Sequence, residues 1–407
     1  KSEIIVGLDI GTTKIGVVVA EPNENGTFKI LGIGNSPAEG LKKGVIVNLE
    51  KAIESVRQAL DDAEMTSGQK IESAYVGIAG DHIKSINSRG VIAIGKSGAE
   101  IIDSDIARAL EAAKAIAIPS DREIIHILPQ EYTVDDQNGI KDPKGFSGIR
   151  LEVDVHIVTG SVSAVQNILR CIEKAGVHVD ELVLEPLASS YGVLSKDEME
   201  LGCVVIDMGG GTTDLAVFHE GAVKHTAVIG IGGKNVTNDL AIGLRTPLEQ
   251  AEQLKCSYGS ALAASVDATE MIHVPGVGGR ESKEVSRSVL ATIIEPRIEE
   301  IFSLVAREMK KAQRTEMLAA GVILTGGAAQ LDSVIELAEQ VFDMPAKMGI
   351  PTNFENSSEL APGPAFATGI GLVQYALSKN KIGVRRGKPR KSTRTFEKIK
   401  RWLNEYF

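Results

Sequence analysis

The chain has 407 residues, which is more than one ordinary hydrophobic core holds, so about two to four domains are expected. A hydrophobic content of 43% and a mean hydropathy of +0.03 are typical of a globular protein, and no apolar run reaches the ~18 residues of a membrane-spanning helix. The net charge is −10, but residues 379–407 contain eleven Lys or Arg and two Glu, a net charge of +9, which leaves −19 on the rest. This acidic body with a basic tail predicts that the tail meets an anionic surface.

The cysteines and histidines show no metal-binding pattern. Cys171, Cys203 and Cys256 lie far apart and form no CxxC motif, which is typical of reduced thiols in a cytoplasmic protein. The seven histidines lack the spacing of paired ligands, so no transition-metal site is predicted.

A strand–turn–strand hairpin is predicted at the start of the chain. An apolar strand over residues 4–8 leads into Asp9, and residues 17–20 form the returning strand. The turn between them offers close backbone approach together with hydroxyl and ammonium donors, from Gly11, Thr12, Thr13 and Lys14. Lys14 is interpreted either as a phosphate ligand or as a solvated hairpin residue.

The segment over residues 82–162 predicts a small separate α+β subdomain. It begins with a strand and continues with a helix to residue 118, for which Asp103 or Ser104 is the expected N-cap. Two further strands are predicted over residues 123–135 and 148–160.

The pattern of the first hairpin recurs at residues 204–218. Its strand ends in Asp207, 198 residues after Asp9, and this domain-sized spacing indicates a duplicated domain. The second turn repeats the donors of the first, with Gly209, Gly210, Gly211, Thr212 and Thr213. Asp214, which follows, is either a structural turn carboxylate or a metal partner.

Two such turns that face each other would surround a phosphate chain with N–H and O–H donors. Because carboxylates repel phosphates, Asp9 and Asp207 are predicted to hold Mg²⁺ through its water molecules. No GxxxxGK[ST] motif occurs and no GxGxxG follows a strand, which excludes a P-loop and leaves a dinucleotide fold without support.

The paired patterns DxGTT and DxGGGTTD resemble the superfamily of actin, Hsp70 and sugar kinases. Three more segments resemble its signatures in the right order: EPLASSYG (185–192) its first connecting helix, GVILTGGAAQL (321–331) its adenosine motif, and APGPAFATGIGLVQYA (361–376) its second connecting helix. The resemblance implies an α/β fold of the actin-like type, with two lobes built by duplication of a ribonuclease-H-like unit, an inserted α+β subdomain and a C-terminal amphipathic helix.

The same resemblance implies roles for individual residues. Glu185 is expected to orient water, and Gly232 and Gly233 to pass near the terminal phosphate, although a plain strand-to-helix turn fits the latter stretch nearly as well. The expected adenosine contacts come from Glu252, Lys255, Gly326, Gly327 and Ala328.

Within the superfamily, the chain resembles the bacterial cell-division FtsA family. The resemblance rests on the layout of residues 82–162 and on GLKKGVIVNLE (40–50), GIAGDHI (77–83) and TGGAAQLDS (325–333). It implies ATP binding with at most weak ATPase activity, self-association into filaments, and attachment of the tubulin-like FtsZ ring by its carboxy-terminal peptide near residues 234–312. Other division proteins are expected to bind residues 82–162.

The predicted domain boundaries follow this layout. The core of the first lobe comprises residues 1–81, 163–194 and 361–378, with the inserted subdomain at 82–162. The second lobe comprises a core at 195–233 and 313–360 and a small subdomain at 234–312, and the tail comprises a flexible linker at 379–393 and a helix at 394–407.

The tail predicts an amphipathic helix that lies at a membrane surface. At 100° per residue its apolar side chains span about 140°: Phe396, Ile399, Trp402, Leu403, Tyr406 and Phe407. The opposite arc includes Lys398, Lys400 and Arg401. Aromatic and basic residues in this arrangement are typical of an interfacial helix on anionic lipid, and predict a peripheral membrane protein. The resemblance to the FtsA family implies that it lies on the cytoplasmic face of the membrane at the division site.

Other interpretations of the sequence remain open. The last helix could pack on the body as an ordinary terminal helix, whereas a nucleic-acid tail is disfavoured because six large apolar residues suit lipid better than phosphate. A small-molecule kinase, or an actin-like scaffold for rod shape or pilus assembly, would share the fold. A kinase would need its cleft open to a second substrate and would not need residues 394–407.

Overall fold

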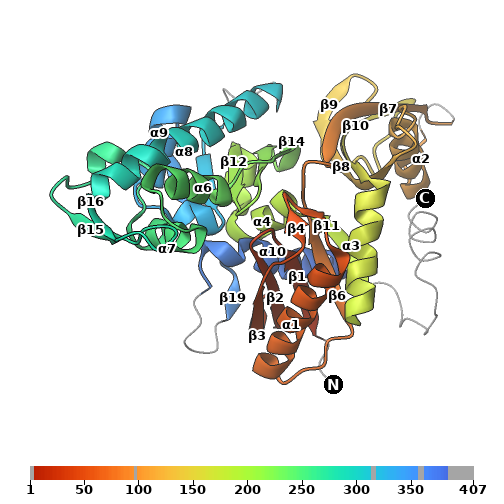
Figure 1. The fold of residues 1–407 in the computed structure, drawn as a ribbon. Helices are drawn as coiled ribbons and strands as arrows, with labels where there is room; N and C mark the ends of the chain where they lie inside the picture. Colours follow the sequence, from red (N-terminus) through yellow and green to blue (C-terminus); the bar gives the residue numbers. More distant parts are fainter. Residues whose placement is uncertain (1–3, 96–98, 313–317, 356–361, 384–407) are drawn as a thin grey trace.

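The computed structural model describes residues 4–95, 99–312, 318–355 and 362–383. Two lobes form the body, each built on a mixed β-sheet (Figure 1). The six strands of the first sheet are, in spatial order, β11 (His178–Leu184), β6 (Ser73–Ile78), β1 (Ile5–Ile10), β2 (Lys14–Pro22), β3 (Phe28–Pro37) and β19 (Phe354–Glu355). The five strands of the second sheet are β14 (Ala222–Ile229), β13 (Thr213–His219), β12 (Cys203–Met208), β17 (Gly321–Thr325) and β18 (Ala346–Met348).

The two sheets repeat one arrangement of strands. In the first lobe, β1 pairs antiparallel with β2 and parallel with β6; in the second, β12 pairs antiparallel with β13 and parallel with β17. The registers also match, because Asp9 lies opposite Gly16 just before one turn and Asp207 lies opposite Asp214 just before the other. Both predicted hairpins and the predicted duplication are therefore confirmed.

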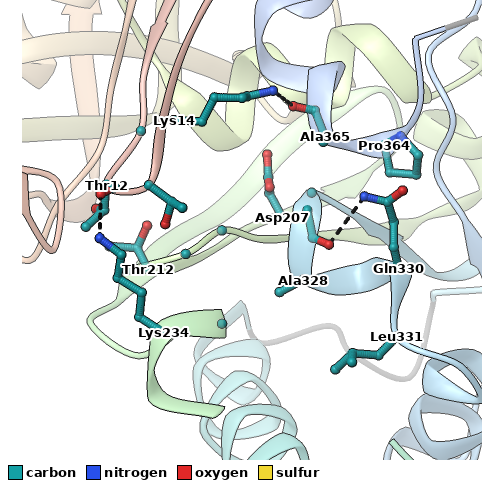
Figure 2. A pocket seen from close by; sticks show the side chains of 18 of the residues that line it. Thr12, Lys14, Asp207, Thr212, Lys234, Ala328, Gln330, Leu331, Pro364 and Ala365 are labelled. Atoms are coloured by element: carbon teal, nitrogen blue, oxygen red, sulfur yellow. Dashed lines mark hydrogen bonds between the residues drawn. The ribbon is translucent and has the colours of Figure 1, made fainter. Parts of the chain in front are cut away.

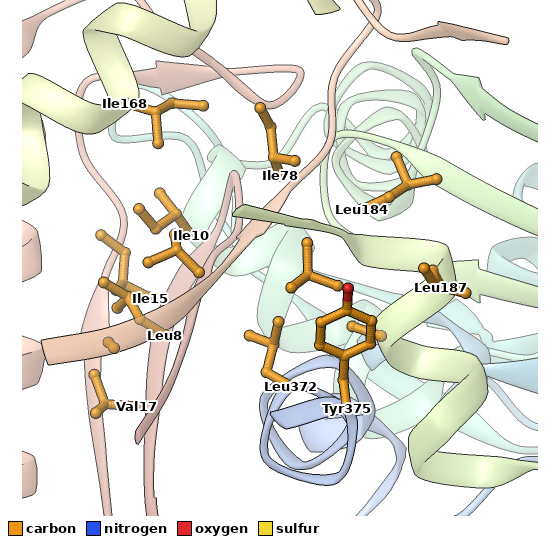
Figure 3. Packing of buried hydrophobic residues seen from close by; sticks show 14 of the residues in the cluster. Leu8, Ile10, Ile15, Val17, Ile78, Ile168, Leu184, Leu187, Leu372 and Tyr375 are labelled. Carbon is orange, nitrogen blue, oxygen red and sulfur yellow. The ribbon is translucent and has the colours of Figure 1, made fainter. Parts of the chain in front are cut away.

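Helices cover both faces of the first-lobe sheet because its strands are apolar on both sides. Along β2, Val17 and Val19 pack in the cluster with α1 and α3, of which Figure 3 shows Val17 and Ile168. Val18 and Ala20, on the opposite face, pack against α10. The remaining elements of this lobe are β4 (Leu41–Lys42), β5 (Val45–Ile46), α1 (Leu49–Ser67), α3 (Val162–Ala175), α4 (Glu185–Val193), the 3₁₀ helix η5 (Pro364–Phe366) and α10 (Ala367–Gly383).

The second lobe has one continuous apolar cluster beneath its helices. Val204, Ile206 and Met208 of β12 face this cluster, whereas Cys203 and Val205 on the other face belong to the cluster of the first lobe. The surrounding elements are α5 (Lys196–Leu201), α6 (Gly233–Leu244), α7 (Leu248–Tyr258), η1 (Ala263–Ser265), β15 (Met271–Val274), β16 (Lys283–Ser286), α8 (Arg287–Met309), η2 (Lys310–Ala312), η4 (Gly327–Gln330) and α9 (Val334–Phe342).

The inserted segment forms a four-stranded antiparallel sheet with one helix on it. The sheet order is β7 (Lys84–Ala93), β10 (Arg150–Ser161), β8 (Arg122–Val134) and β9 (Gln137–Ile140), and the helix is α2 (Asp103–Ala113). The α+β class is confirmed, but two local predictions were wrong. The N-cap of α2 is Ile102, whose N–H donates to Asp105, rather than Asp103 or Ser104, and α2 ends five residues before residue 118.

Two helices, α4 and α10, cross between the sheets. They approach closely because their contact carries glycines: a Cβ atom on Gly371 would lie 1.8 Å from the carbonyl oxygen of Ala188. Likewise, a Cβ atom on Gly192 would lie 2.6 Å from the carbonyl oxygen of Ala367. The glycines of both connecting helices therefore allow close packing.

The tail prediction is tested only at its start. Helix α10 continues to Gly383, so the expectation of a flexible linker from residue 379 was wrong for its first five residues. The rest of the predicted linker and the predicted helix over residues 394–407 lie outside the described residues. Within the described residues, no helix combines the length and apolar composition needed to cross a membrane.

Candidate functional site

A cleft of about 490 Å³ opens between the lobes, at the carboxyl ends of β1 and β12 (Figure 2). Seventeen of the residues predicted from the sequence line it: Asp9, Gly11, Thr12, Thr13, Lys14, Glu185, Asp207, Gly209, Gly210, Gly211, Thr212, Gly233, Glu252, Lys255, Gly326, Gly327 and Ala328. Two others lie outside this lining, because the hydroxyl of Thr213 donates to the carbonyl of Ile231 and Gly232 packs behind the second turn. The structure therefore brings the two Gly–Thr turns together at one cleft.

The two turns contact each other through their glycines and threonines. A Cβ atom on Gly210 would lie 1.8 Å from the hydroxyl oxygen of Thr13, and one on Gly211 would lie 2.5 Å from that of Thr12. The absence of a side chain at both positions is thus a steric requirement of this arrangement.

The start of α6 supports the second turn. The N–H of Gly233 donates to the carbonyl of Gly209 at 2.9 Å, and the N–H of Lys234 donates to that of Gly210 at 2.8 Å. These two amides therefore hold the turn in place. Gly232 packs against the same turn, because a Cβ atom on it would lie 2.6 Å from the carbonyl oxygen of Gly209.

Two lysines, one from each lobe, line the cleft. Lys14 donates to the carbonyl of Ala365 at 2.9 Å, and its ammonium lies 3.7 Å from the centre of the Phe366 ring. Lys234 donates to the carbonyl of Thr12 at 2.8 Å and so bridges the lobes (Figure 2). The sequence analysis gave Lys234 no role, although it directly follows the Gly-rich turn.

Four carboxyl groups with raised pKa values border the cleft. Burial raises the pKa of Asp9 to about 7, where the nearby charge of Lys14 lowers it and that of Asp207 raises it. Burial also raises the pKa of Asp207, and it raises the pKa values of Glu185 and Asp214 well above their ordinary range, with neighbouring carboxylates adding to the effect. Such a concentration of buried acidic groups is typical of a functional site.

The carboxylates fit a hydrated magnesium ion better than a directly bound metal. Among the described residues, no three His, Cys, Asp or Glu side chains are grouped to hold a metal ion. However, one buried oxygen of Asp214, Oδ1, has no hydrogen-bond partner, and a nearby cation would offset the burial of all four groups. Mg²⁺ commonly keeps several waters and binds through one or two carboxylates and the phosphates of a ligand. This donor set suits that mode of binding.

Asp207 is held by hydroxyl groups from both crossing helices. Ser189 of α4 and Thr368 of α10 each donate to its Oδ2 atom, Thr368 at 3.1 Å. The sequence analysis missed both residues. Ser189 could have been predicted, because it lies four positions after Glu185 and hence on the same helix face. Thr368 belongs to a distant segment of the chain, so only the tertiary fold shows that it lies beside Asp207.

Gly326 and the residues Glu252 and Lys255 form a further part of the cleft lining. Gly326 has φ 91°, in the left-handed region that favours glycine, and a Cβ atom there would lie 2.3 Å from Oδ1 of Asp207. Glu252 and Lys255 form an ion pair at 2.7 Å on one face of α7, as their spacing predicts, and Lys255 also donates to the Thr237 hydroxyl at 2.9 Å. Gly326, directly after β17, and Gly327 and Ala328 of η4 also line the cleft.

Comparisons with known proteins identify the family. The chain is 45% identical over 412 residues to the cell division protein FtsA of Pseudomonas aeruginosa, covering 100% of this chain and 98% of that protein. It is 37% identical over 415 residues to FtsA of Escherichia coli K12, with 100% and 98% covered, and 38% identical over 381 residues to FtsA of Bacillus subtilis 168, with 94% and 85% covered. The chain belongs to the FtsA family.

Family models agree with this assignment. Residues 204–371 match the model for cell division protein FtsA, and residues 80–159 match the SHS2 domain inserted in FtsA, which corresponds to the sheet of β7, β10, β8 and β9. The expected family and the actin-like fold with its insertion are confirmed, and the chain is an actin-like cell division protein.

Solved structures share the fold at lower identity. The PilM–PilN complex of type IV pilus biogenesis gives a TM-score of 0.67 at 17% identity, over 92% of this chain and 98% of that chain. MreB5 of Spiroplasma citri bound to ADP gives a TM-score of 0.56 at 15% identity, over 95% and 99%.

Proposed function

We propose that this FtsA-family chain binds Mg-ATP between its lobes, polymerises on the cytoplasmic face of the membrane at the division site, and there tethers the FtsZ ring. The observation that carries the proposal is the meeting of two matching Gly–Thr turns, one from each lobe, at a single cleft. Paired turns of this kind present N–H and O–H donors to a phosphate chain from both sides.

In this proposal, each part of the nucleotide contacts a different part of the cleft lining. The triphosphate lies between the turns at Gly11–Lys14 and Gly209–Thr212, where Lys14 and Lys234 supply positive charge. The adenosine lies against Gly326, Gly327 and Ala328, opposite Glu252 and Lys255. The ADP bound to MreB5 of Spiroplasma citri, a protein of the same fold, supports an adenine nucleotide.

Magnesium, when bound, would neutralise phosphate charge, and Asp9 and Asp207 are the residues that would hold it through water molecules. Glu185 lines the cleft and is the residue that we assign to orient a water molecule. The ATPase activity that we assign to the chain is weak at most, as membership of the FtsA family implies. The protein then acts mainly as a nucleotide-controlled assembly factor.

Nucleotide binding favours assembly because it selects one arrangement of the lobes. A ligand held by both turns binds most tightly when the turns are close, and so shifts the population toward the closed state. We assign that state to the filament.

The tail supplies the membrane contact. The amphipathic segment at 394–407 lies outside the described residues, and its assignment rests on its composition: six large apolar side chains on one face and basic residues beside them. The carboxy-terminal peptide of FtsZ binds near residues 234–312, and other division proteins bind the inserted subdomain at 82–162. Both partner assignments rest on membership of the FtsA family.

Vesicle co-sedimentation tests the proposal. The full chain and a chain lacking residues 394–407 are spun with anionic vesicles, with and without Mg-ATP and with and without an FtsZ carboxy-terminal peptide. The full chain should pellet, more strongly with ATP because a filament binds through many tails, and should carry the peptide with it. Trp402→Glu, which keeps the chain length, should lose binding as the truncation does. Equal pelleting of the truncated chain would contradict the proposed membrane contact.

A further inference from the structure

Ser189 and Thr368 converge on one oxygen of a buried carboxylate. Ser189 is completely buried in α4, Thr368 is 6% exposed in α10, and both donate to Oδ2 of Asp207 at the end of β12. Their two hydroxyl oxygens lie 3.0 Å apart. Each hydroxyl has a single hydrogen, so once both hydrogens serve Asp207, no donor remains for a bond between them.

The other oxygen of this carboxylate, Oδ1, is the one available to the cleft that Asp207 lines. Oδ1 of Asp207 lies beside Gly326, at a position where a Cβ atom would come within 2.3 Å of it. The carboxylate group of an aspartate is symmetric and can rotate about the Cβ–Cγ bond unless a contact holds one of its oxygens. Two charge-assisted hydrogen bonds on Oδ2 therefore fix the direction of Oδ1.

The three residues come from three different parts of the fold. Asp207 belongs to the sheet of the second lobe, while α10 packs on the first-lobe sheet, where a Cβ atom on Gly7 would lie 2.4 Å from the carbonyl of Gly369. Helix α4 lies between them and also carries Glu185, one turn before Ser189. A rotation of one lobe against the other therefore changes the contacts on Asp207.

We propose that Ser189 and Thr368 are positioning residues for the magnesium site: they orient Asp207 toward the water shell of the ion and make its orientation depend on the crossing of α4 and α10. This inference rests on the proposed binding of Mg-ATP and deepens it. It assigns the two hydroxyls a role, exerted through Asp207, in how strongly magnesium supports nucleotide binding.

The test is calorimetric titration of ATP in excess Mg²⁺ and in EDTA, on the full chain. In Ser189→Ala/Thr368→Val, the factor by which Mg²⁺ strengthens ATP binding should fall by about 10- to 100-fold, the usual effect of losing the partners of a metal-site ligand. Affinity in EDTA should change by less than about threefold, because both hydroxyl hydrogens serve Asp207 and Ser189 lies outside the cleft lining, to which Thr368 belongs. Thr368→Ser, which keeps the hydroxyl, should behave as the original chain does.

The chain offers a matched control in the next residue. Ser190 is equally buried in α4, but its hydroxyl donates to the carbonyl of Pro186 at 2.6 Å, so Ser190→Ala removes a buried hydroxyl without touching Asp207. It should leave the effect of Mg²⁺ unchanged. Thermal melting checks that each variant is folded, and the single variants Ser189→Ala and Thr368→Val provide the same comparison if the double variant unfolds.

The outcomes separate the inference from the proposed function. An unchanged effect of Mg²⁺ in the folded double variant, an equal loss of affinity in EDTA, or an equal loss in Ser190→Ala would overturn the positioning role. Absence of ATP binding by the unsubstituted chain would overturn the proposed function itself, and is seen before any variant is compared.

Discussion

Single residues of the cleft were the easiest part of the site to find from the sequence. Asp9, Asp207 and the glycines of both turns follow apolar strands, and their pattern occurs twice, so their meeting was predictable. Ser189 and Thr368 were not predicted: the position of Ser189 one turn after Glu185 was overlooked, and Thr368 has no local pattern that marks it. Their role depends on which helix faces cross, and that is a property of the tertiary fold.

Gly210→Ala should weaken ATP binding by about tenfold or more, because a methyl group that close to the Thr13 hydroxyl forces the turns apart. Isothermal titration of Mg-ATP measures the effect. Gly16→Ala is the control, since the nearest atom to its added carbon would be 3.7 Å away on the flexible Lys14 side chain. Similar losses in both variants would show that the turn contact is not the cause.

The buried carboxyl groups predict a pH dependence of stability without nucleotide. The pKa of Asp9 is about 7 in the folded chain and near its ordinary 3.8 when unfolded, so the folded state binds more protons between these values. The contribution of Asp9 to the free energy of unfolding therefore falls as pH rises from about 4 to 7, and this loss is complete above pH 7. Melting temperatures across this range should show a smaller fall in Asp9→Asn. An identical pH profile for the two chains would contradict the assignment.

At the scale of elements, the sequence predicted the two hairpins and three strands of the inserted subdomain because their apolar runs and turns are local, but it gave no strand at β3, β6, β11 or β14. It missed β9, a strand of four mostly exposed residues that has little apolar signal. It also placed a linker on the last residues of α10, because a basic composition resembles a tail. The structure instead has Lys379 paired with Glu181 and lying 5.1 Å from the ring centre of Tyr375, contacts that no local pattern reveals.

Gly371→Ala should destabilise the chain by roughly 1–3 kcal/mol, because the added carbon overlaps the backbone of α4 and the crossing helices must separate. Urea denaturation measures the loss. Gly95→Ala is the comparison, as its added carbon would meet no heavy atom within 4 Å. Unchanged stability of Gly371→Ala would mean that the close approach of α4 and α10 is not required.

At the scale of the whole molecule, the inserted subdomain connects the two lobes. It is covalently part of the first lobe, yet Ser85 and Gln130 donate to carbonyls of β14 in the second lobe, and Lys141 pairs with Glu200 at 2.7 Å. His156 lies in this contact, completely buried between Asn87 at 2.6 Å and Thr226 at 2.8 Å. The sequence predicted the subdomain but gave no indication of this contact, whose polar residues are scattered along the chain.

His156→Ala should loosen the contact and speed hydrogen exchange of the β14 amides. Burial, aided by His225, lowers the pKa of His156 to about 3, so the neutral ring both donates and accepts here, and its loss leaves Thr226 without this partner. Hydrogen–deuterium exchange measures the change, with His273→Ala, exposed on β15, as control. Unaltered exchange in β14 would show that this bridge is not stabilising.

The central claim is that the two turns form one site for Mg-ATP, and calorimetric titration of Mg-ATP into the full chain tests it most directly. We predict saturable binding of Mg-ATP to the full chain. The Asp207→Ala variant should not bind Mg-ATP, although its circular dichroism should show that the fold is retained. Absence of binding heat in the unsubstituted chain, or undiminished affinity in the folded Asp207→Ala variant, would contradict it.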